Sequence, residues 1–316
     1  MYILGISAFY HDSAAALLCD GDLVAAAQEE RFTRIKFDHR FPEQAIDYCL
    51  KEAGITVKDL DYVVFYEKPM PKFDRLLRSH LETYPRSWQV FREAMIAWFS
   101  EKLWLNAAIS SNLKFPLEKI LFVEHHLSHA ASAMFCSPFD KAAVLTVDGV
   151  GEWTTTTMGH ATADWGNGLS NEIVLDQEIK FPHSLGLLYS AFTGWLGFKV
   201  NSGEYKVMGM APYGKPLHMD KLEKIVKTYN DGSFWLNMDY FSYHYSLNKT
   251  YNQKFLNLFG PPREPELPFF TATTGDDLTG RGKAAEENQY YADIAASVQS
   301  LTEDVLLKAA NNLHAR

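Results

Sequence analysis

The stretch ILGISAFYHDSAAALLCDGDLVAAAQ (residues 3–28) consists of apolar runs separated by polar turns. Asp20-Gly21 lies between two of these runs, and Asp-Gly in that setting is a strong β-hairpin signal. A helical pattern from Pro42 to Gly54 follows. Strands that alternate with helices indicate an α/β fold. We expect strands at 3–7, 14–19, 23–28 and 61–67, with a polar loop, FYHDS, after the first.

A second cycle repeats this order of elements. The apolar strand AAVLTV (142–147) leads into the glycine-rich loop DGVGE, and two more strands are expected at 153–161 and 172–180. The two cycles share no clear residue identity, so they form a weak internal repeat. We expect two α/β domains, 1–140 and 141–316, the second with an irregular insertion at about 228–285.

Composition argues against several classes of protein. Of the 316 residues, 47% are hydrophobic and 22% charged, as in water-soluble globular proteins. A net charge of −9 argues against a general nucleic-acid binder but leaves a local basic pocket open. Residues 88–105 are apolar but include Arg92, Glu93, Glu101 and Lys102, so we expect an amphipathic helix and no membrane partner.

Cysteine usage and the N-terminus bear on the compartment. The three cysteines are widely spaced and do not suggest a disulfide framework. The first residues, MYILGIS, lack a basic segment and a cleavage site. Both features favour a reducing environment, so we expect a cytoplasmic protein.

The stretch VEHHLSHAASAMF (123–135) contains three of the chain's 11 histidines. If it is helical, His125 and His129 are four residues apart and share a face, where two imidazoles can hold one metal ion. His126 points away from that face. The alternative is a set of solvated or hydrogen-bonded histidines at a helix start.

Asp148 strengthens the metal hypothesis, because it follows an apolar strand, as His125 follows the strand at 119–124. In open α/β sheets, ligands bind at the carboxyl ends of strands. Two imidazoles and a carboxylate suit Fe(II), Zn or Mn. The alternative for Asp148-Gly149 is a simple hairpin turn, which explains neither Gly151 nor Glu152. Such a loop can bring backbone N–H groups close to a phosphate.

The polar loop of the first cycle contains His11, Asp12 and Ser13 among apolar neighbours. An imidazole can take a proton from a hydroxyl near neutral pH, so His11 is a candidate general base. The alternative is a polar loop with a hydrogen-bonded histidine.

Two basic segments are candidates for nucleotide contacts. EERFTRIKFDHRF (29–41) includes Lys36 and three arginines and can clamp a phosphate. Its alternative is a solvated loop whose arginines pair with Glu29, Glu30 and Asp38. Lys206 lies in the glycine-punctuated segment 201–216, expected to be a loop, where it can reach a nucleotide or be an ordinary surface lysine.

The motifs LGISAFYHDSAAAL, EERFTRIK, VEHHLSHAASA, TVDGVGEW and GEYKVMGMAPYGKP occur in this order. Together they resemble O-carbamoyltransferases of the nodulation-protein-U type, which include antibiotic-tailoring enzymes. The likeness covers Tyr2 to about Gly214 and returns at ADIAASVQSLTE (292–303). It implies an actin-like ATPase fold with two ribonuclease-H-like lobes, each built of ββ-β-α elements.

The resemblance also implies roles for particular residues. His125, His129 and Asp148 are expected to hold an iron-type metal, Fe(II) with Zn or Mn as alternatives. His11 is the expected base, and Lys36 is expected to contact carbamoyl-adenylate. The remaining expected nucleotide-binding residues are Ser13, Gly149, Gly151, Glu152 and Lys206.

The implied reaction moves a carbamoyl group from carbamoyl-adenylate, made from ATP and carbamoyl phosphate, to a hydroxyl of a small-molecule acceptor. The chain resembles about the first half of a family member, so we expect an incomplete second lobe and a missing C-terminal half as partner. A fragment and a truncated gene are both compatible with this, and we expect the chain alone to be inactive. The alternatives are a threonylcarbamoyl-transfer protein for tRNA, a sugar-kinase-like ATPase that uses Mg²⁺, and a non-catalytic binding module.

Overall fold

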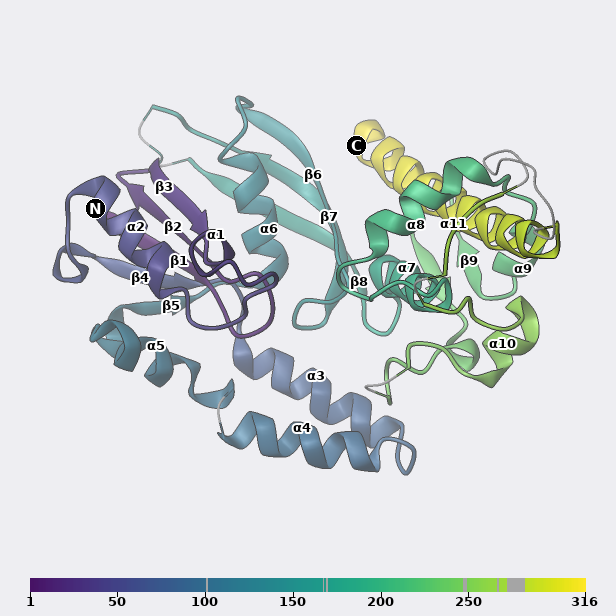
Figure 1. Ribbon diagram of the computed structural model, residues 1–316. Helices are drawn as coiled ribbons and strands as arrows, with labels where there is room; N and C mark the ends of the chain where they lie inside the picture. The colour runs from purple at the N-terminus through teal and green to yellow at the C-terminus, as the bar shows by residue number, and fades with distance from the viewer. Residues whose placement is uncertain (101, 167, 169, 247–248, 266, 272–281) are drawn as a thin grey trace. The chain divides into compact units, whose positions relative to one another are not determined.

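The computed structural model describes residues 1–316 except 101, 167, 169, 247–248, 266 and 272–281 (Figure 1). The chain forms two compact units, the first made of residues 1–77 and 91–129 and the second of residues 78–90 and 130–316. Both contain sheets and helices, so the expected α/β class is confirmed. The boundary between units falls inside the helix that begins at His125, and the domain limit expected after residue 140 stays a prediction.

The first unit is built on a five-stranded sheet of order β3-β2-β1-β4-β5 (Figure 1). Its first three strands form an antiparallel meander, while β4 and β5 run parallel to β1. The strands are β1 (Tyr2–Ser7), β2 (Ala14–Cys19), β3 (Asp22–Gln28), β4 (Tyr62–Phe65) and β5 (Ile120–Phe122). The predicted hairpin and its turn are therefore confirmed.

Alternation along the strands decides which face of this sheet is covered. Leu4 and Ile6 of β1 and Leu17 of β2 are buried on the same face. Helix α2 (Glu43–Ala53) packs on β2 and β3 and contributes Ala45, Ile46, Cys49 and Leu50 to the same core. It ends at Gly54, whose left-handed φ of 66° is the helix stop expected from the sequence.

The other helices that include residues of the first unit lie between and after the strands. They are α1 (Glu30–Thr33), α3 (Pro69–Glu82), α4 (Trp88–Ser100), α5 (Leu105–Leu113) and α6 (His125–Met134). Short 3₁₀ turns occupy Val57–Asp59, Lys102–Trp104 and Leu117–Lys119. The apolar segment 88–105 is thus a helix followed by a 3₁₀ turn. Within the residues described, no helix combines the length and apolarity that a membrane crossing requires.

The second unit contains an antiparallel sheet of order β6-β7-β8, formed by Lys141–Val147, Thr154–Thr162 and Glu172–Lys180. These strands match the second predicted cycle. Ala130 and Met134, in the later turns of α6, pack against one face of this sheet through Val144 and Ala161. The meander of the first unit therefore recurs in the second unit, as the weak repeat predicts.

The main core of the second unit is formed by helices rather than by the sheet. Trp195, Phe192, Phe255 and Phe259 lie fully buried at its centre. The helices are α7 (Leu185–Trp195), α8 (Glu204–Met210), α9 (Met219–Leu222), α10 (Gln253–Phe259) and α11 (Gly282–Ala315), with 3₁₀ turns at Ala211–Tyr213 and Met238–Tyr240.

The segment predicted to be an irregular insertion is more ordered than expected. Strand β9 (Val226–Thr228) pairs antiparallel with β10 (Phe234–Leu236), and α10 follows. Aromatic side chains such as Phe234 and Phe255 are buried. The segment therefore packs through aromatic residues although its sequence shows no clear helix or strand periodicity. Residues 272–281 of the stretch rich in Pro, Thr and Gly lie outside the described residues.

Candidate functional site

Helix α6 begins with the histidine-rich motif and belongs to the first unit up to residue 129. Nε2 of His125 and Nε2 of His129 are 3.0 Å apart, and the ring planes meet at 79°. Tyr66, which follows β4, packs its ring edge-on against His125 at 5.5 Å between centroids. His126 is buried, with only 4% of its surface exposed. The four-residue spacing thus brings two imidazole nitrogens together at the helix start.

Asp148 lies directly after β6, in the second unit, as expected. Its backbone N–H donates to the carbonyl of Thr155, and its Oδ1 accepts from the N–H of Gly149 at 2.6 Å. Gly151 donates its N–H to the carbonyl of Thr154. The backbone donors predicted to meet a phosphate therefore bind protein oxygens here. Glu152 is buried at 8% exposure.

Helix α7 begins directly against the loop that contains Asp148. Ser184 caps this helix by accepting from the N–H of Leu187, and its hydroxyl donates to the carbonyl of Gly149 at 2.7 Å. Gly186 approaches so closely that a Cβ there would lie 2.8 Å from the backbone of Asp148. Neither residue is among the predicted site residues, although a serine before an apolar helical run is an N-cap signal.

The loop after β1 takes an unusual backbone path. Phe9 and Asp12 have φ values of 68° and 48°, in the left-handed region that is uncommon for residues other than glycine. Nδ1 of His11 lies 2.9 Å from Oδ2 of Asp12, and both side chains are partly exposed. Ser13 behaves differently, since it is 1% exposed and its hydroxyl lacks a hydrogen-bond partner among the described residues.

The structure joins this loop to the basic segment. Phe9 donates its N–H to the carbonyl of His39, and Ser13 donates to the carbonyl of Asp38, both at 2.8 Å. Arg40 forms a two-point ion pair with Asp38, and its hydrogen bonds hold the pKa of the buried Asp38 carboxyl well below the usual range. The loop that contains His11 is thus hydrogen-bonded to residues 38–39 of the basic segment.

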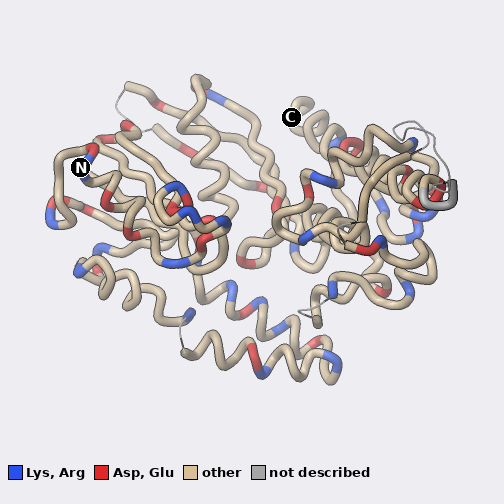
Figure 2. Tube along the Cα trace, in the orientation of Figure 1, with Lys and Arg blue, Asp and Glu red and all other residues tan. Residues whose placement is uncertain are grey.

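The solvated alternative for the basic segment is correct only in part. Arg31 contacts Glu30 at 3.3 Å and Arg40 pairs with Asp38, as that alternative expects. Glu29, in contrast, is buried and accepts from the N–H groups of Gln44 and Ala45 at the start of α2. Figure 2 shows acidic and basic residues interspersed along the described trace.

Lys36 and Lys206 are both exposed. Lys36 lies in the turn that follows α1. Lys206 does not lie in a loop, because residues 204–210 form α8, and its Nζ lies 5.8 Å from the ring of Phe198. The carboxylate of Glu204 accepts from the N–H groups of Asn201 and Gly203, which fixes the start of this helix. The loop expected at 201–216 was therefore wrong.

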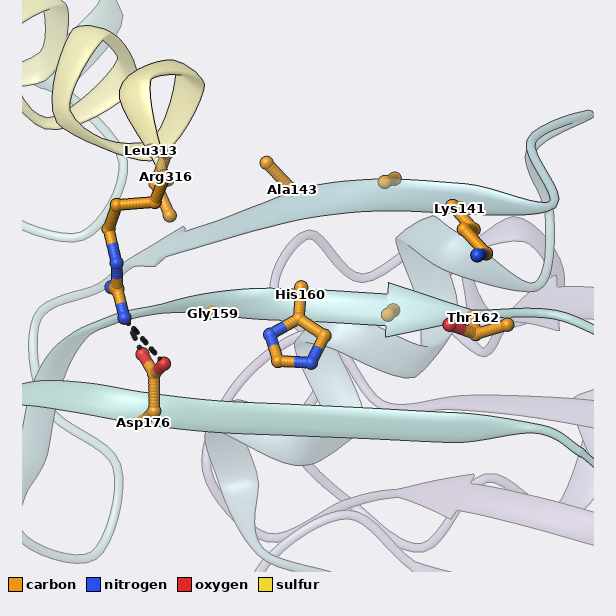
Figure 3. Close-up of a pocket in the computed structure, with 10 residues that line it drawn as sticks. Lys141, Ala143, Gly159, His160, Thr162, Asp176, Leu313 and Arg316 are labelled. Carbon is orange, nitrogen blue, oxygen red and sulfur yellow. Dashed lines mark hydrogen bonds and ion pairs between the residues drawn. The ribbon is translucent and has the colours of Figure 1, made fainter.

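A separate pocket of about 510 Å³ lies in the second unit, between the C-terminal end of α11 and the sheet (Figure 3). Arg316 reaches Asp176 across it at 2.7 Å, and His160 projects from β7 beside this pair. The predicted site residues do not line this pocket, whose lining is Lys141, Ala142, Ala143, Gly159, His160, Ala161, Thr162, Asp176, Leu313 and Arg316.

Comparison with known proteins identifies the family. Residues 2–316 match the family described as Carbamoyltransferase N-terminus. The chain belongs to this family. An uncharacterized Synechocystis protein, sll1178, is 51% identical over 99% of this chain and 48% of its own length. Nodulation protein NolNO of Sinorhizobium fredii is 33% identical over 73% of this chain and 32% of its own length.

These relatives are longer than the chain, which spans about half of the Synechocystis protein. Among solved structures, YeaZ from Pseudomonas aeruginosa is similar at a TM-score of 0.31 and 14% identity, over 57% of this chain and 66% of YeaZ. Membership of the Carbamoyltransferase N-terminus family agrees with the resemblance seen in the sequence motifs.

Proposed function

We propose that this chain is the transfer domain of an O-carbamoyltransferase, which moves a carbamoyl group from carbamoyl-adenylate to a hydroxyl of a small molecule. Family membership over residues 2–316 supports carbamoyl transfer in general. The relatives extend well beyond the matched region, so we assign the formation of carbamoyl-adenylate from ATP and carbamoyl phosphate to a second half of that architecture.

The observation that carries this proposal is the facing pair of imidazoles in α6. Two nitrogens bound to one ion at about 2.0–2.1 Å each lie at most ~4.2 Å apart. The separation of 3.0 Å between the Nε2 atoms of His125 and His129 satisfies that limit. The same separation also suits a hydrogen bond between the two rings. A measurement of bound metal therefore distinguishes a metal site from a hydrogen-bonded histidine pair.

Asp148 is the proposed third ligand, and each of the three residues offers one ligand atom. Two imidazoles and one carboxylate form a donor set that suits Fe(II), with Zn or Mn as alternatives. When bound, the ion would act as a Lewis acid that polarises the carbamoyl carbonyl. Tyr66 restricts the ring of His125 and so favours its orientation toward His129.

His11 is the proposed general base. It accepts the proton of the acceptor hydroxyl, whose oxygen then forms a bond to the carbamoyl carbon. The bond between this carbon and the phosphate oxygen breaks, and AMP leaves with the electron pair. The partial exposure of His11 leaves it accessible to an acceptor from solvent.

The proposed nucleotide contacts are of two kinds. Lys36 and Lys206 are exposed cations that can pair with a phosphate. The N–H groups of Gly149 and Gly151 would have to exchange their present oxygen partners for phosphate oxygens. Ser13 and Glu152 are buried and would shape the site, Ser13 with an unsatisfied hydroxyl.

Metal analysis tests the proposal. The chain is expressed with iron, zinc and manganese in the medium, and bound metal is measured by mass spectrometry after desalting. We expect close to one ion per chain in the wild type and loss of most of it in His125→Ala and His129→Ala. The matched control is His160→Ala, an exposed histidine on β7, which should keep its metal.

Equal metal content in the wild type and both α6 variants would contradict the proposed site. Binding of Mg²⁺ alone would favour a kinase-like ATPase instead, because Mg²⁺ prefers oxygen ligands.

A further inference from the structure

The strained loop after β1 places a carboxylate beside the proposed base. His11 and Asp12 are sequence neighbours, and neighbouring side chains in an extended chain point to opposite sides. The left-handed φ of 48° at Asp12 instead turns its carboxylate back, so that Oδ2 lies 2.9 Å from Nδ1 of His11. A backbone conformation of this kind is costly and persists only where the surroundings hold it.

Several contacts hold this loop in place. Its two ends are bound to the segment at 38–39 through the N–H groups of Phe9 and Ser13. The ring of Tyr10 stacks at a tilt on the ring of His11, with centroids 4.5 Å apart. The hydrogen bonds at the two ends of the loop and the ring contact of Tyr10 together support its strained backbone.

Tyr10 is itself held from the other side. Nζ of Lys72 lies 5.1 Å from the Tyr10 ring, a distance at which a cation attracts an aromatic face. Lys72 is fixed by a two-point contact with Glu67, whose carboxylate is 2.6 and 2.8 Å away and which is 7% exposed. The chain of contacts from Glu67 through Lys72 and Tyr10 thus ends on the imidazole of His11.

We propose that Asp12 is a positioning residue that fixes His11 in the tautomer with the proton on Nδ1. An ionised carboxylate can only accept a hydrogen bond, so the nitrogen beside it must carry the proton. The lone pair then lies on Nε2, which faces away from Asp12 and can accept a proton. This inference rests on the proposed function for its catalytic consequence.

The arrangement has a consequence for the transfer step. When Nε2 takes the proton of the acceptor hydroxyl, the imidazole becomes a cation with both nitrogens protonated. The carboxylate of Asp12 then stabilises that cation and restricts rotation of the ring. Asp12 lies directly beside this ring, and the charged pair of Lys72 and Glu67 reaches it through Tyr10.

The tautomer can be measured directly by long-range ¹H–¹⁵N NMR of the full chain labelled with ¹⁵N-histidine. The His11→Gln variant identifies the signals of His11. We expect the wild type to show a protonated Nδ1 and an unprotonated Nε2 for this residue. Asp12→Asn should shift His11 toward the Nε2–H tautomer, because an amide can donate as well as accept. Asparagine tolerates the left-handed backbone, so the loop should keep its path.

The activity readout is AMP release from carbamoyl-adenylate in the presence of a hydroxyl acceptor, measured with the C-terminal half of a longer family member supplied in trans. We expect Asp12→Asn to lower kcat at least about 10-fold with little change in KM, less than the ~10⁴-fold loss known for a buried carboxylate that fixes a catalytic histidine, because Asp12 is partly exposed. Asp22→Asn, at the exposed start of β3, is the matched control and should leave both readouts unchanged.

An unchanged tautomer in Asp12→Asn would overturn the inference, as would a shifted tautomer with unchanged kcat. If the wild type released no AMP even with that C-terminal half supplied, the proposed function would fail, and the NMR spectrum would still decide whether Asp12 sets the tautomer.

Discussion

The loop after β1 and the loop after β6 occupy the same place in two similar meanders, but they are held in different ways. The first loop depends on strained residues, Phe9 and Asp12, and presents the side chain of His11 to solvent. The second contains Gly149 and Gly151, whose backbone N–H groups donate to oxygens of the protein itself. The same order of strands therefore exposes an imidazole at one loop and places hydrogen-bonded backbone N–H groups beside an acid group at the other.

The anchors of the two loops differ in the same way. The first loop is bound to the segment at 38–39. An ion pair between the exposed Arg40 and the buried Asp38 supports this segment. The second is bound to the start of α7 by the fully buried Ser184 and by the close approach of the half-buried Gly186. Packing should therefore dominate the stability of the second loop, and charge that of the first.

The largest expected effect is at the second loop. Replacing Gly186 with alanine places a Cβ 2.8 Å from the backbone of Asp148 and Gly149, where no flexible side chain can move aside. We expect the free energy of unfolding to fall by about 1–3 kcal/mol, the usual cost of overpacking. Urea titration followed by circular dichroism measures this change.

Gly209→Ala is the matched control for this prediction. Gly209 lies in α8, and a Cβ there would meet nothing within 4 Å. Alanine should raise the free energy of unfolding by about 0.5–1 kcal/mol, because it is the better helix former. If Gly186→Ala were as stable as wild type, the packed description of the second loop would be wrong.

The elements that the sequence predicted well are those with strong local signals. The Asp20-Gly21 turn and the alternation in β1 and β2 define a meander that local patterning can identify. The histidine pair could also be predicted from the sequence, because residues four apart in a helix lie on the same face.

Helix α8 shows where local signals failed. Gly203, Gly209 and Pro212 indicated a loop, but Val207 and Met210 are buried in the core of the second unit. Tertiary burial therefore outweighed the weak helix propensity of the segment.

The anchors of the two loops were beyond local inference. Phe9 donates to His39, Ser13 donates to Asp38 and Ser184 donates to Gly149, all between residues far apart in the sequence. The left-handed backbone of Asp12 was equally hidden, because aspartate tolerates that conformation without requiring it and the contacts that select it here come from residues distant in the sequence.

A smaller effect is expected at the cap of α7. Ser184→Ala removes the acceptor for the N–H of Leu187 and the donor to the carbonyl of Gly149. We expect the free energy of unfolding to fall by about 1 kcal/mol, as for other lost N-caps. Ser100→Ala, at an exposed serine at the end of α4, should change it by less than about 0.5 kcal/mol in the same urea titration. Equal losses in both variants would mean that Ser184 does not anchor the second loop.

The smallest expected effect is at the anchor of the first loop, and it depends on pH. Hydrogen bonds from Arg40 depress the pKa of Asp38, so its ionised form stabilises the folded state. Such a contribution is fully present above the unfolded pKa of about 3.9 and is lost as pH falls through the folded pKa. The wild type should therefore lose more stability between pH 5 and pH 2 than Asp38→Asn, which cannot ionise.

Urea midpoints measured at several pH values for the wild type, Asp38→Asn and the exposed control Asp22→Asn test this difference. The Arg40 side chain is 58% exposed, so solvent screens the pair and the difference should be modest. High salt should reduce it further, whereas the loss in Gly186→Ala should persist because packing is not screened. If salt changed the two losses equally, charge would not distinguish the anchor of the first loop from the packed anchor of the second.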